Sequence, residues 1–203
     1  MQIEPETEYK FLVSDEQFNK YFALFVEKYG KAATKLQVNY YYDTEDNLLN
    51  KNDVTVRVRQ GRDKLKWQIK KHSGKCGALF SSDEYSGSVE ELPRFLTVDG
   101  VNEELLLKGS LVTERRVINF GVSGKLCFDI SMYLGVIDYE IEIEYLEQDK
   151  PMGDAIAAVI DSNMASTTTK SDRFIKRWEE INNGKSKCSQ NFLIHFSKAR
   201  DKK

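Results

Sequence analysis

The stretch Asp138–Tyr145, which reads DYEIEIEY, decides the fold of this chain. Acidic residues alternate in it with tyrosine and isoleucine, and a period of two residues predicts a β-strand with one charged face and one apolar face. Residues 57–75 show a similar alternation with the opposite sign, because eight basic residues and a single acid, Asp63, lie there among apolar residues. Blocks of like charge usually indicate a solvated or disordered segment. The interleaved apolar residues instead predict that these charges line one face of a sheet.

The two-residue period recurs along much of the chain, and it predicts eight strands. They are Ile3–Val13, Val38–Asp43, Val54–Gln60, Lys64–Lys71, Leu79–Tyr85, Leu111–Phe120, Lys125–Ile130 and Ile137–Glu147. Gly61–Asp63 and Gly121–Gly124 have the composition of hairpin turns. A charged face on strand after strand is explained if an antiparallel sheet closes into a barrel, with apolar faces packed outward against helices and charged faces around a water-filled interior. The basic and acidic blocks should then face each other across that interior.

The fold class predicted is therefore α+β, an eight-stranded antiparallel β-barrel with flanking helices. Ser14 followed by Gln17 resembles a capping box, which predicts an amphipathic helix to about Tyr29. Apolar spacing predicts three further helices, over residues 92–108, 152–163 and 171–181. From residue 182 the chain is polar and without periodicity. We expect one domain over residues 1–181 and a C-terminal tail over residues 182–203.

Composition limits the possible classes of function. The 203 residues include 30 basic and 32 acidic side chains, and the formal net charge of −2 argues against a generic basic face for nucleic acid or an anionic membrane. Three widely spaced cysteines (Cys76, Cys127, Cys188) suit neither a disulfide framework nor a zinc site. No apolar run approaches a membrane span, and the first residues are acidic rather than those of a signal sequence. These features predict a cytoplasmic protein with no membrane partner.

Two acidic rows predict a metal site. Glu6 and Glu8 lie two residues apart, so on a strand both carboxylates point the same way, and Lys10 follows on the same face. A second row with this spacing lies near the other end of the chain (Glu140, Glu142, Glu144). Clustered carboxylates repel one another unless a cation neutralises them, and Mg²⁺ or Mn²⁺ does so with oxygen ligands alone. The chain has only two histidines, which makes a zinc site with nitrogen ligands a poor alternative.

Arg57 and Arg59 present two guanidinium groups to one side of a strand, a geometry that suits phosphate oxygens. Taken alone, they are explained as well by cross-strand ion pairs on the surface, and so are the glutamates. Charge of the same parity on most of the strands favours a shared interior instead. Acidic pairs, a metal and basic rows in one cavity describe a site for a polyanion. A chain of phosphates fits best, with the metal polarising a phosphorus for attack by water.

The chain resembles the CYTH superfamily, the triphosphate tunnel metalloenzymes. Glu6–Lys10 (ETEYK) matches the ExExK signature of that family, which is weak evidence alone because charged strands can produce it by chance. An ordered set of motifs strengthens the resemblance over about residues 1–180: Asn39–Thr44 (NYYYDT), Arg57–Arg59, Trp67–Lys70 (WQIK), Glu84, Thr113–Arg115 (TER), Asp129, Asp138–Glu142 (DYEIE) and Lys170–Arg173 (KSDR). The pattern is most similar to that of small bacterial CYTH proteins.

The resemblance implies an eight-stranded tunnel that binds a triphosphate or nucleoside triphosphate with Mg²⁺ or Mn²⁺. The residues that it implies as metal ligands are Glu6, Glu8, Glu84, Asp129, Glu140 and Glu142. Those that it implies for phosphate binding are Lys10, Arg57, Arg59, Lys70, Arg115 and Lys170. The residues that it implies for catalysis are Glu6, Glu8, Glu142 and Lys10.

Three of these assignments stay open. Glu144 shares the face of Glu142 and is an alternative to either glutamate of that pair. Arg116 has the opposite parity to Arg115, so only one of the two can face inward on a regular strand. The assignment of Glu84 depends only on the register of its strand, and the nearby acids Asp83 and Glu90 are alternatives if that register is shifted.

Four other features have simpler explanations. His72 adjoins a glycine-containing loop and could assist proton transfer, but a solvated loop histidine is the better interpretation. Tyr40–Tyr42 fits core and rim packing better than a platform for base stacking. Cys127 lies between Leu126 and Phe128 and is expected to be buried. Lys66 and Gln68 share the face of Lys70 and are expected to line either the tunnel or its mouth.

The function predicted is metal-dependent hydrolysis of inorganic triphosphate or a small organic triphosphate. The first alternative is a class IV adenylate cyclase, in which the ribose hydroxyl of ATP replaces water as the nucleophile. An RNA 5′-triphosphatase is disfavoured because no basic strip is evident outside the strand faces. A noncatalytic polyphosphate or nucleotide sensor would keep the basic residues but would not need both acidic pairs, so their presence favours an enzyme. Its oligomeric state is expected to be a monomer or a homodimer.

Overall fold

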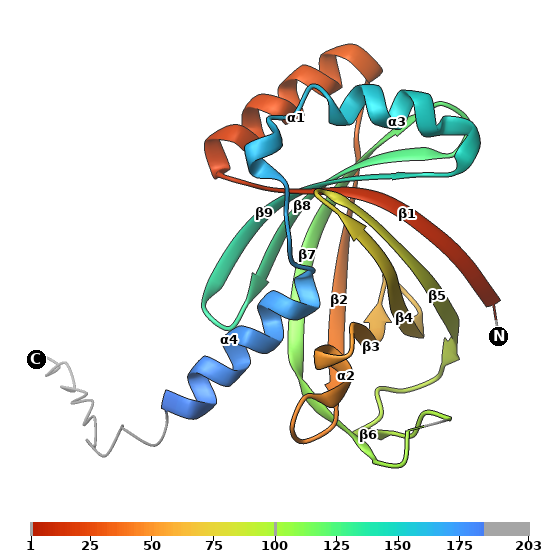
Figure 1. Ribbon diagram of the computed structural model, residues 1–203, viewed down its shortest axis with the longest axis vertical. Coiled ribbons are helices and arrows are strands. Elements are labelled where there is room, and N and C mark those ends of the chain that lie inside the picture. The colour runs from red at the N-terminus through yellow and green to blue at the C-terminus, as the bar shows by residue number, and fades with distance from the viewer. Residues whose placement is uncertain (1, 100, 185–203) are drawn as a thin grey trace, which may run out of the picture.

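Eight antiparallel strands close into a barrel in the computed structural model, which describes residues 2–99 and 101–184 (Figure 1). The order of the sheet is β2-β3-β4-β5-β1-β9-β8-β7, with β6 beyond β7, and the pairing of β2 with β7 completes the ring. The strands are β1 (Gln2–Val13), β2 (Ala33–Asp43), β3 (Val54–Gln60), β4 (Leu65–Cys76), β5 (Leu79–Val89), β6 (Phe95–Leu96), β7 (Leu105–Phe120), β8 (Gly124–Tyr133) and β9 (Val136–Tyr145). The predicted eight-stranded antiparallel barrel is confirmed.

Helices cover the outer apolar faces of the barrel. They are α1 (Asp15–Tyr29), α2 (Leu48–Lys51), α3 (Lys150–Ala157) and α4 (Lys170–Gly184), with 3₁₀ turns at Glu147–Asp149 and Ser162–Met164. The predicted capping box opens α1, because Gln17 N–H donates to Ser14 Oγ (3.2 Å) and Ser14 N–H donates to Gln17 Oε1 (2.9 Å). Phe18 and Phe25 of α1 pack on Phe128 of β8, in a cluster that includes the outer residues of β7 and β9. Burial of each such side chain contributes about 1.5–3 kcal/mol.

α3 lies beside α1 over one end of the barrel, at the top of Figure 1. Tyr9 of β1 donates a hydrogen bond to Asp154 of α3 (2.9 Å), which ties this helix to the strand that carries the ExExK residues. α3 ends earlier than the predicted helix over residues 152–163, because the chain turns at Ala158 and then forms the second 3₁₀ turn.

The predicted helix over residues 92–108 is wrong. The structure has the short strand β6 in this segment, and β7 begins at Leu105. Leu105 is fully buried against Tyr42 and Val58, whereas Leu107 is exposed. Three consecutive leucines fit an apolar helix face and a strand equally well from the sequence, and pairing of β7 with β2 and β6 decides for the strand.

α4 closes one end of the barrel interior. Thr169 and Asp172 form a capping box, with Thr169 N–H donating to Asp172 Oδ2 (2.8 Å) and Asp172 N–H donating to Thr169 Oγ1 (3.2 Å). Phe174 then packs on Tyr41 (ring centroids 5.0 Å apart) and Tyr133 (6.1 Å), both from the barrel wall. Gly109 makes room for it, because a Cβ there would lie 3.0 Å from Phe174 Cζ and its φ of +147° disfavours other residues.

α4 continues to Gly184, three residues past the predicted end at residue 181, and the rest of the tail predicted over residues 182–203 lies outside the described residues. Within residues 2–99 and 101–184, no helix has both the length and the apolar content needed to cross a membrane.

We expect Phe174→Ala to lower the free energy of unfolding by about 3–5 kcal/mol, because it empties the cluster that closes the barrel. Urea denaturation followed by circular dichroism measures this loss. The control is Ile137→Ala, since Ile137 is 59% exposed on β9 and its truncation should change stability by no more than about 0.5 kcal/mol. Equal losses in the two variants would contradict the packing role of Phe174.

Candidate functional site

The charged side chains line a cavity of about 220 Å³ inside the barrel. Of the twelve residues predicted for the site, ten line this cavity: Glu6, Glu8, Lys10, Arg57, Arg59, Lys70, Glu84, Arg115, Glu142 and Lys170. The other two, Asp129 and Glu140, are fully buried in the wall and contact Lys170. The register of the strands brings eleven of the twelve to the inner face or directly behind it, and helix α4 brings Lys170.

The ring order separates the two signs of charge. β2 and β3 lie half of the ring away from β1 and β9, so the basic strand pair faces the acidic strand pair across the cavity. Arg57 and Arg59 are on β3, whereas Glu8 and Glu142 are on β1 and β9. The predicted opposition of the two blocks therefore holds for the part of the basic block on β3, whereas Lys70 of β4 contacts Glu6 and Glu8 of β1.

Two lysines, one on β1 and one on β4, contact the carboxylates of β1. Lys10 Nζ lies 2.8 Å from Glu8 and 2.7 Å from Glu142, so it joins β1 to β9. Lys70 Nζ, from β4, lies 2.6 Å from both Glu6 and Glu8. Each ammonium group thus shares two carboxylates, and Glu8 is shared by both lysines.

Arg115 and Lys170 hold the second acidic group. Arg115 contacts both oxygens of Asp129 (2.8 and 2.7 Å), donates to Glu144 (2.6 Å) and also reaches Glu142. Lys170, at the start of α4, lies 2.9 Å from Asp129 and 2.8 Å from Glu142. The helix that closes the barrel therefore also delivers a cation to its interior.

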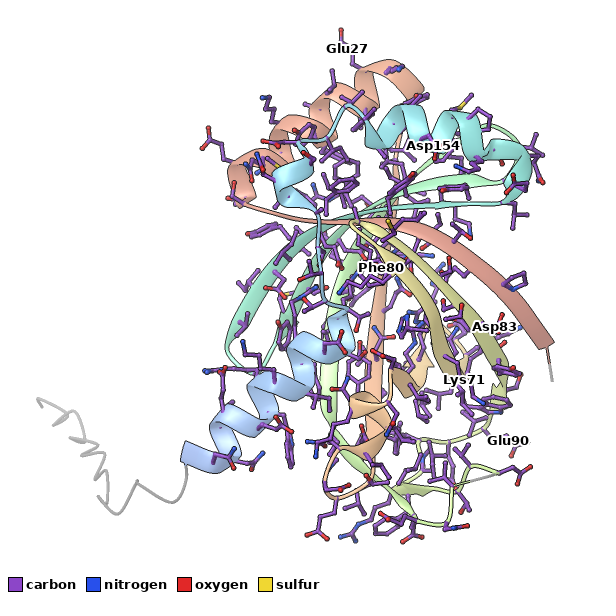
Figure 2. All side chains as sticks on the ribbon, viewed as in Figure 1. Glu27, Lys71, Phe80, Asp83, Glu90 and Asp154 are labelled. Atoms are coloured by element: carbon purple, nitrogen blue, oxygen red, sulfur yellow. The ribbon has the colours of Figure 1, made fainter. Side chains whose placement is uncertain are left out.

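The structure resolves two of the open assignments. Arg115 faces the cavity, whereas Arg116 points outward over the ring of Phe22, with its guanidinium carbon 5.1 Å from the ring centroid. Glu84 lines the cavity and contacts Arg57 (3.4 Å) and Gln68. The alternative acids Asp83 and Glu90 are exposed on the outside, where Figure 2 labels them.

The ion pairs set the charge states of the acids. Burial raises the pKa of Glu8, but Lys10 and Lys70 outweigh this effect and lower it to about 2. The pKa of Glu142 is also lowered, well below its ordinary value, because Lys10, Lys170 and Arg115 outweigh burial. The pKa of Glu6 is raised by burial and by the neighbouring charge of Glu8. Glu6 is therefore the acid of this group that would gain most from a further cation.

Two of the cations that line the cavity lack a carboxylate partner among the described residues. Arg59 donates to the amide oxygen of Asn39 (2.8 Å), and burial together with the charge of Arg57 lowers its pKa to about 10. Lys35 of β2 lines the cavity too, and burial and Arg115 lower its pKa. Both groups would be stabilised by an anion in the cavity.

Sequence reasoning missed two cavity cations, Lys35 and Lys125. Lys35 precedes the predicted start of its strand at Val38, and Lys125 opens its strand without being singled out. Their parity was a usable signal, because Lys35 is in step with Asn39 and Lys125 is in step with Asp129.

Within residues 2–99 and 101–184, two groups of carboxylates could hold a metal ion. Glu6, Glu8 and Glu144 form one group, and Asp129, Glu140 and Glu142 form the other, with oxygens within 4.8 Å of one another in each. All three members of the first group line the cavity, whereas two of the second are buried behind Lys170 and Arg115. The first group, with oxygen donors alone and the raised pKa of Glu6, fits a hard divalent cation better. Glu84 belongs to neither group.

Three residues with simpler interpretations can now be located. His72 lies on β4 and lines the cavity, so the interpretation as a solvated loop residue is wrong; β4 extends past Lys71 to Cys76. Cys127 is buried as expected, but on the charged inner face, with Sγ 3.7 Å from Glu144. Tyr41 packs on Phe174, in agreement with a packing role.

The CYTH domain family matches residues 4–174, and the chain therefore belongs to this family. A protein from Bacillus halodurans, described as a candidate adenylate cyclase, is 27% identical with a TM-score of 0.68, over 86% of this chain and 99% of its own. A Hippeastrum protein, described as a candidate adenylyl cyclase with a dominant triphosphatase activity, is 18% identical with a TM-score of 0.65, over 84% and 95%. The Mimivirus capping enzyme triphosphatase is 11% identical with a TM-score of 0.52, over 76% and 87%. The last two show a shared fold. Comparison with curated protein sequences found no match.

We expect the protein to lose stability as the pH falls from about 4.5 towards 2. The folded pKa of Glu8, about 2, lies below its ordinary value of 4.5, so its stabilising contribution is complete above pH 4.5 and disappears as the carboxylate is protonated. Each pKa unit corresponds to about 1.4 kcal/mol, which gives about 3–4 kcal/mol for this group. Melting temperatures between pH 7 and pH 2.5 measure the effect.

The control for this experiment is Glu27→Gln, on the outer surface of α1 (Figure 2). It should leave the pH profile unchanged, whereas Glu8→Gln should flatten it. A wild-type melting temperature that is constant down to pH 3 would contradict the assigned ion pairs.

Proposed function

We propose that this protein is a divalent-metal-dependent triphosphatase that binds the phosphate chain inside the barrel. One observation carries the proposal: eight cations and five carboxylates line the cavity, so its formal balance is three positive charges. A fully ionised triphosphate has five negative charges, and with one divalent metal ion the complex has three. The lining of the cavity is therefore opposite in sign to the complex, as the site of a polyanion requires.

The size of the cavity supports a small substrate. Its 220 Å³ is below the roughly 300–1,000 Å³ of pockets that enclose drug-sized ligands. Inorganic triphosphate, or the phosphate chain of an organic triphosphate whose remainder stays outside, fits this volume better than a whole nucleotide. The triphosphatase activities described for the Hippeastrum and Mimivirus proteins agree with this class of substrate.

The basic side of the cavity would bind the phosphates. Arg59 and Lys35 have no carboxylate to displace, so they would engage phosphate oxygens first. Arg57 contacts Glu84 and Lys70 contacts Glu8, so each of these cations would contact a carboxylate and a phosphate at the same time. Lys10 would do the same at the boundary between the two sides. Such charge-assisted contacts neutralise the phosphate chain and stabilise the charge that shifts to the leaving group.

The acidic side would hold Mg²⁺ or Mn²⁺. Glu6 and Glu8 would be ligands, with Glu144 as the third carboxylate of their group. When bound, the metal would neutralise phosphate oxygens and polarise the phosphorus. Glu142, Asp129 and Glu140 would keep Arg115 and Lys170 in place, so their part in catalysis would be to position cations.

A class IV adenylate cyclase is the second candidate, because the Bacillus halodurans protein is described in those terms. The cavity favours hydrolysis over cyclisation. Among the described residues that line it, Tyr41 and His72 are the aromatic ones, and Tyr41 already packs on Phe174. An adenine ring would find no free stacking surface there.

The purified protein is expected to release orthophosphate from triphosphate in the presence of Mg²⁺ or Mn²⁺, and to lose this activity with EDTA. Triphosphate, ATP and thiamine triphosphate are compared, and orthophosphate, pyrophosphate and cyclic AMP are measured. Cyclic AMP with pyrophosphate as the products from ATP would contradict a hydrolase. Tight triphosphate binding without turnover would contradict an enzyme and favour a sensor.

Glu8→Gln is the variant for this assay, because it keeps the shape of the side chain and removes one carboxylate of the proposed metal site. Turnover should fall by at least roughly 100-fold. The matched control is Glu16→Gln, an exposed glutamate in the first turn of α1, which should retain wild-type activity.

We expect Arg59→Gln to weaken triphosphate binding by roughly 10- to 100-fold, because a charge-assisted contact contributes about 1.5–3 kcal/mol. Isothermal titration calorimetry measures Kd. Arg62→Gln, in the exposed turn between β3 and β4, is the matched control and should bind within about twofold of wild type. Equal weakening in both variants would indicate a general electrostatic effect rather than a contact.

A further inference from the structure

Two uncharged side chains on the inner wall of the barrel each have a buried polar atom with no hydrogen-bond partner among the described residues. These atoms are Nδ1 of His72 and Oγ of Ser82. The pairing of β4 with β5 sets these two residues directly opposite each other, and the pairing of β1 with β5 sets Glu6 on the other side of Ser82. Ser82 is only 3% exposed, and His72 lines the cavity. A row of three polar residues thus crosses β4, β5 and β1.

A buried polar atom without a hydrogen-bond partner destabilises the folded protein, because it has lost its contacts with water. Native proteins satisfy such atoms with ordered water, which typically makes about three hydrogen bonds to groups of this kind. Cross-strand neighbours have Cα atoms about 4.5–5.5 Å apart, so one small molecule can contact both side chains. The two atoms therefore point to a bound oxygen rather than to a structural hydrogen bond within the protein.

The surroundings of His72 select an uncharged ligand. Burial, together with repulsion by Lys70 and Lys10, lowers the pKa of His72 to about 4, so its imidazole is neutral at pH 7. Its ring packs edge-on against Phe80, at 6.5 Å between centroids. A neutral imidazole and a hydroxyl compete poorly with eight cations for phosphate, but they can donate to and accept from water.

We propose that His72 and Ser82 bind and orient the water molecule that attacks the terminal phosphorus of the substrate. This inference rests on the triphosphatase function proposed above. The water oxygen forms a bond to the terminal phosphorus as the bridging P–O bond breaks, and the electron pair of that bond stays on the diphosphate. One proton of the water stays with the phosphate and the other goes to the diphosphate. Triphosphate and water therefore yield one hydrogenphosphate and one hydrogendiphosphate.

The test compares kcat and KM for triphosphate in His72→Leu, His72→Asn and Ser82→Ala with those of the wild type. His72→Leu and Ser82→Ala should lower kcat by roughly 10- to 100-fold, because the nucleophile loses its orientation. KM should stay within about twofold, because the cations that bind the phosphates are unchanged. His72→Asn should recover at least part of kcat, since its amide returns a polar atom near the position of Nδ1.

Ser81→Ala is the matched control, because Ser81 neighbours Ser82 on β5 and points to the opposite face. It should retain wild-type kcat. Melting temperatures separate a catalytic loss from a folding defect, and the two conservative variants decide the outcome if His72→Leu does not fold. Unchanged kcat in Ser82→Ala and in His72→Asn and His72→Leu, or a rise in KM alone, would overturn the proposal. An inactive wild type would instead overturn the proposed triphosphatase function.

Discussion

Ion pairs inside the barrel make its charged interior possible. A buried charge without a partner costs several kcal/mol, and removal of one member of a buried pair leaves the other exposed to that cost. Lys10 joins Glu8 to Glu142, and Lys70 contacts both Glu6 and Glu8, so β1 is linked to β9 and to β4 through shared carboxylates. The contacts hold each side chain in one orientation before any ligand binds. A phosphate chain or a metal ion would then meet a site that is already ordered, which reduces the entropic cost of binding.

Closure of the sheet determines where each kind of residue can lie. The charged faces point inward, so the apolar faces point outward and need cover, which α1 supplies through Phe18 and Phe25. The end of the barrel covered by α4 is different, because the inward-facing residues there are apolar. Tyr41 and Tyr133 pack with Phe174 of α4 and close the interior. α4 thereby combines two roles: its apolar face fills the barrel end, and its first residue, Lys170, contributes to the charged site. Stability and site geometry depend on the same helix.

Regular alternation made most of the site predictable. Glu6, Glu8 and Lys10 share one parity on a strand, and that parity alone indicates a common face. The prediction was weaker where the local pattern fits two structures. Leu105–Leu107 fits a helix or a strand, and pairing with β2 decided for the strand. The interpretation of His72 as a loop residue was wrong because β4 continues beyond Lys71, past a register shift at His72 and Gly74. The β-propensity of a glycine-containing segment says little about whether a strand continues through it.

The sequence by itself determined which residues form the charged face, because the two-residue period of a strand is a local property of the chain. It also determined that acids and bases are segregated, since DYEIEIEY and the basic block lie on different strands. Only the tertiary structure decided which charges pair. Ring order sets β3 across from β9, register sets Ser82 between His72 and Glu6, and docking of α4 brings Lys170 to Asp129. These are contacts between residues far apart in the chain, and they depend on closure of the whole sheet.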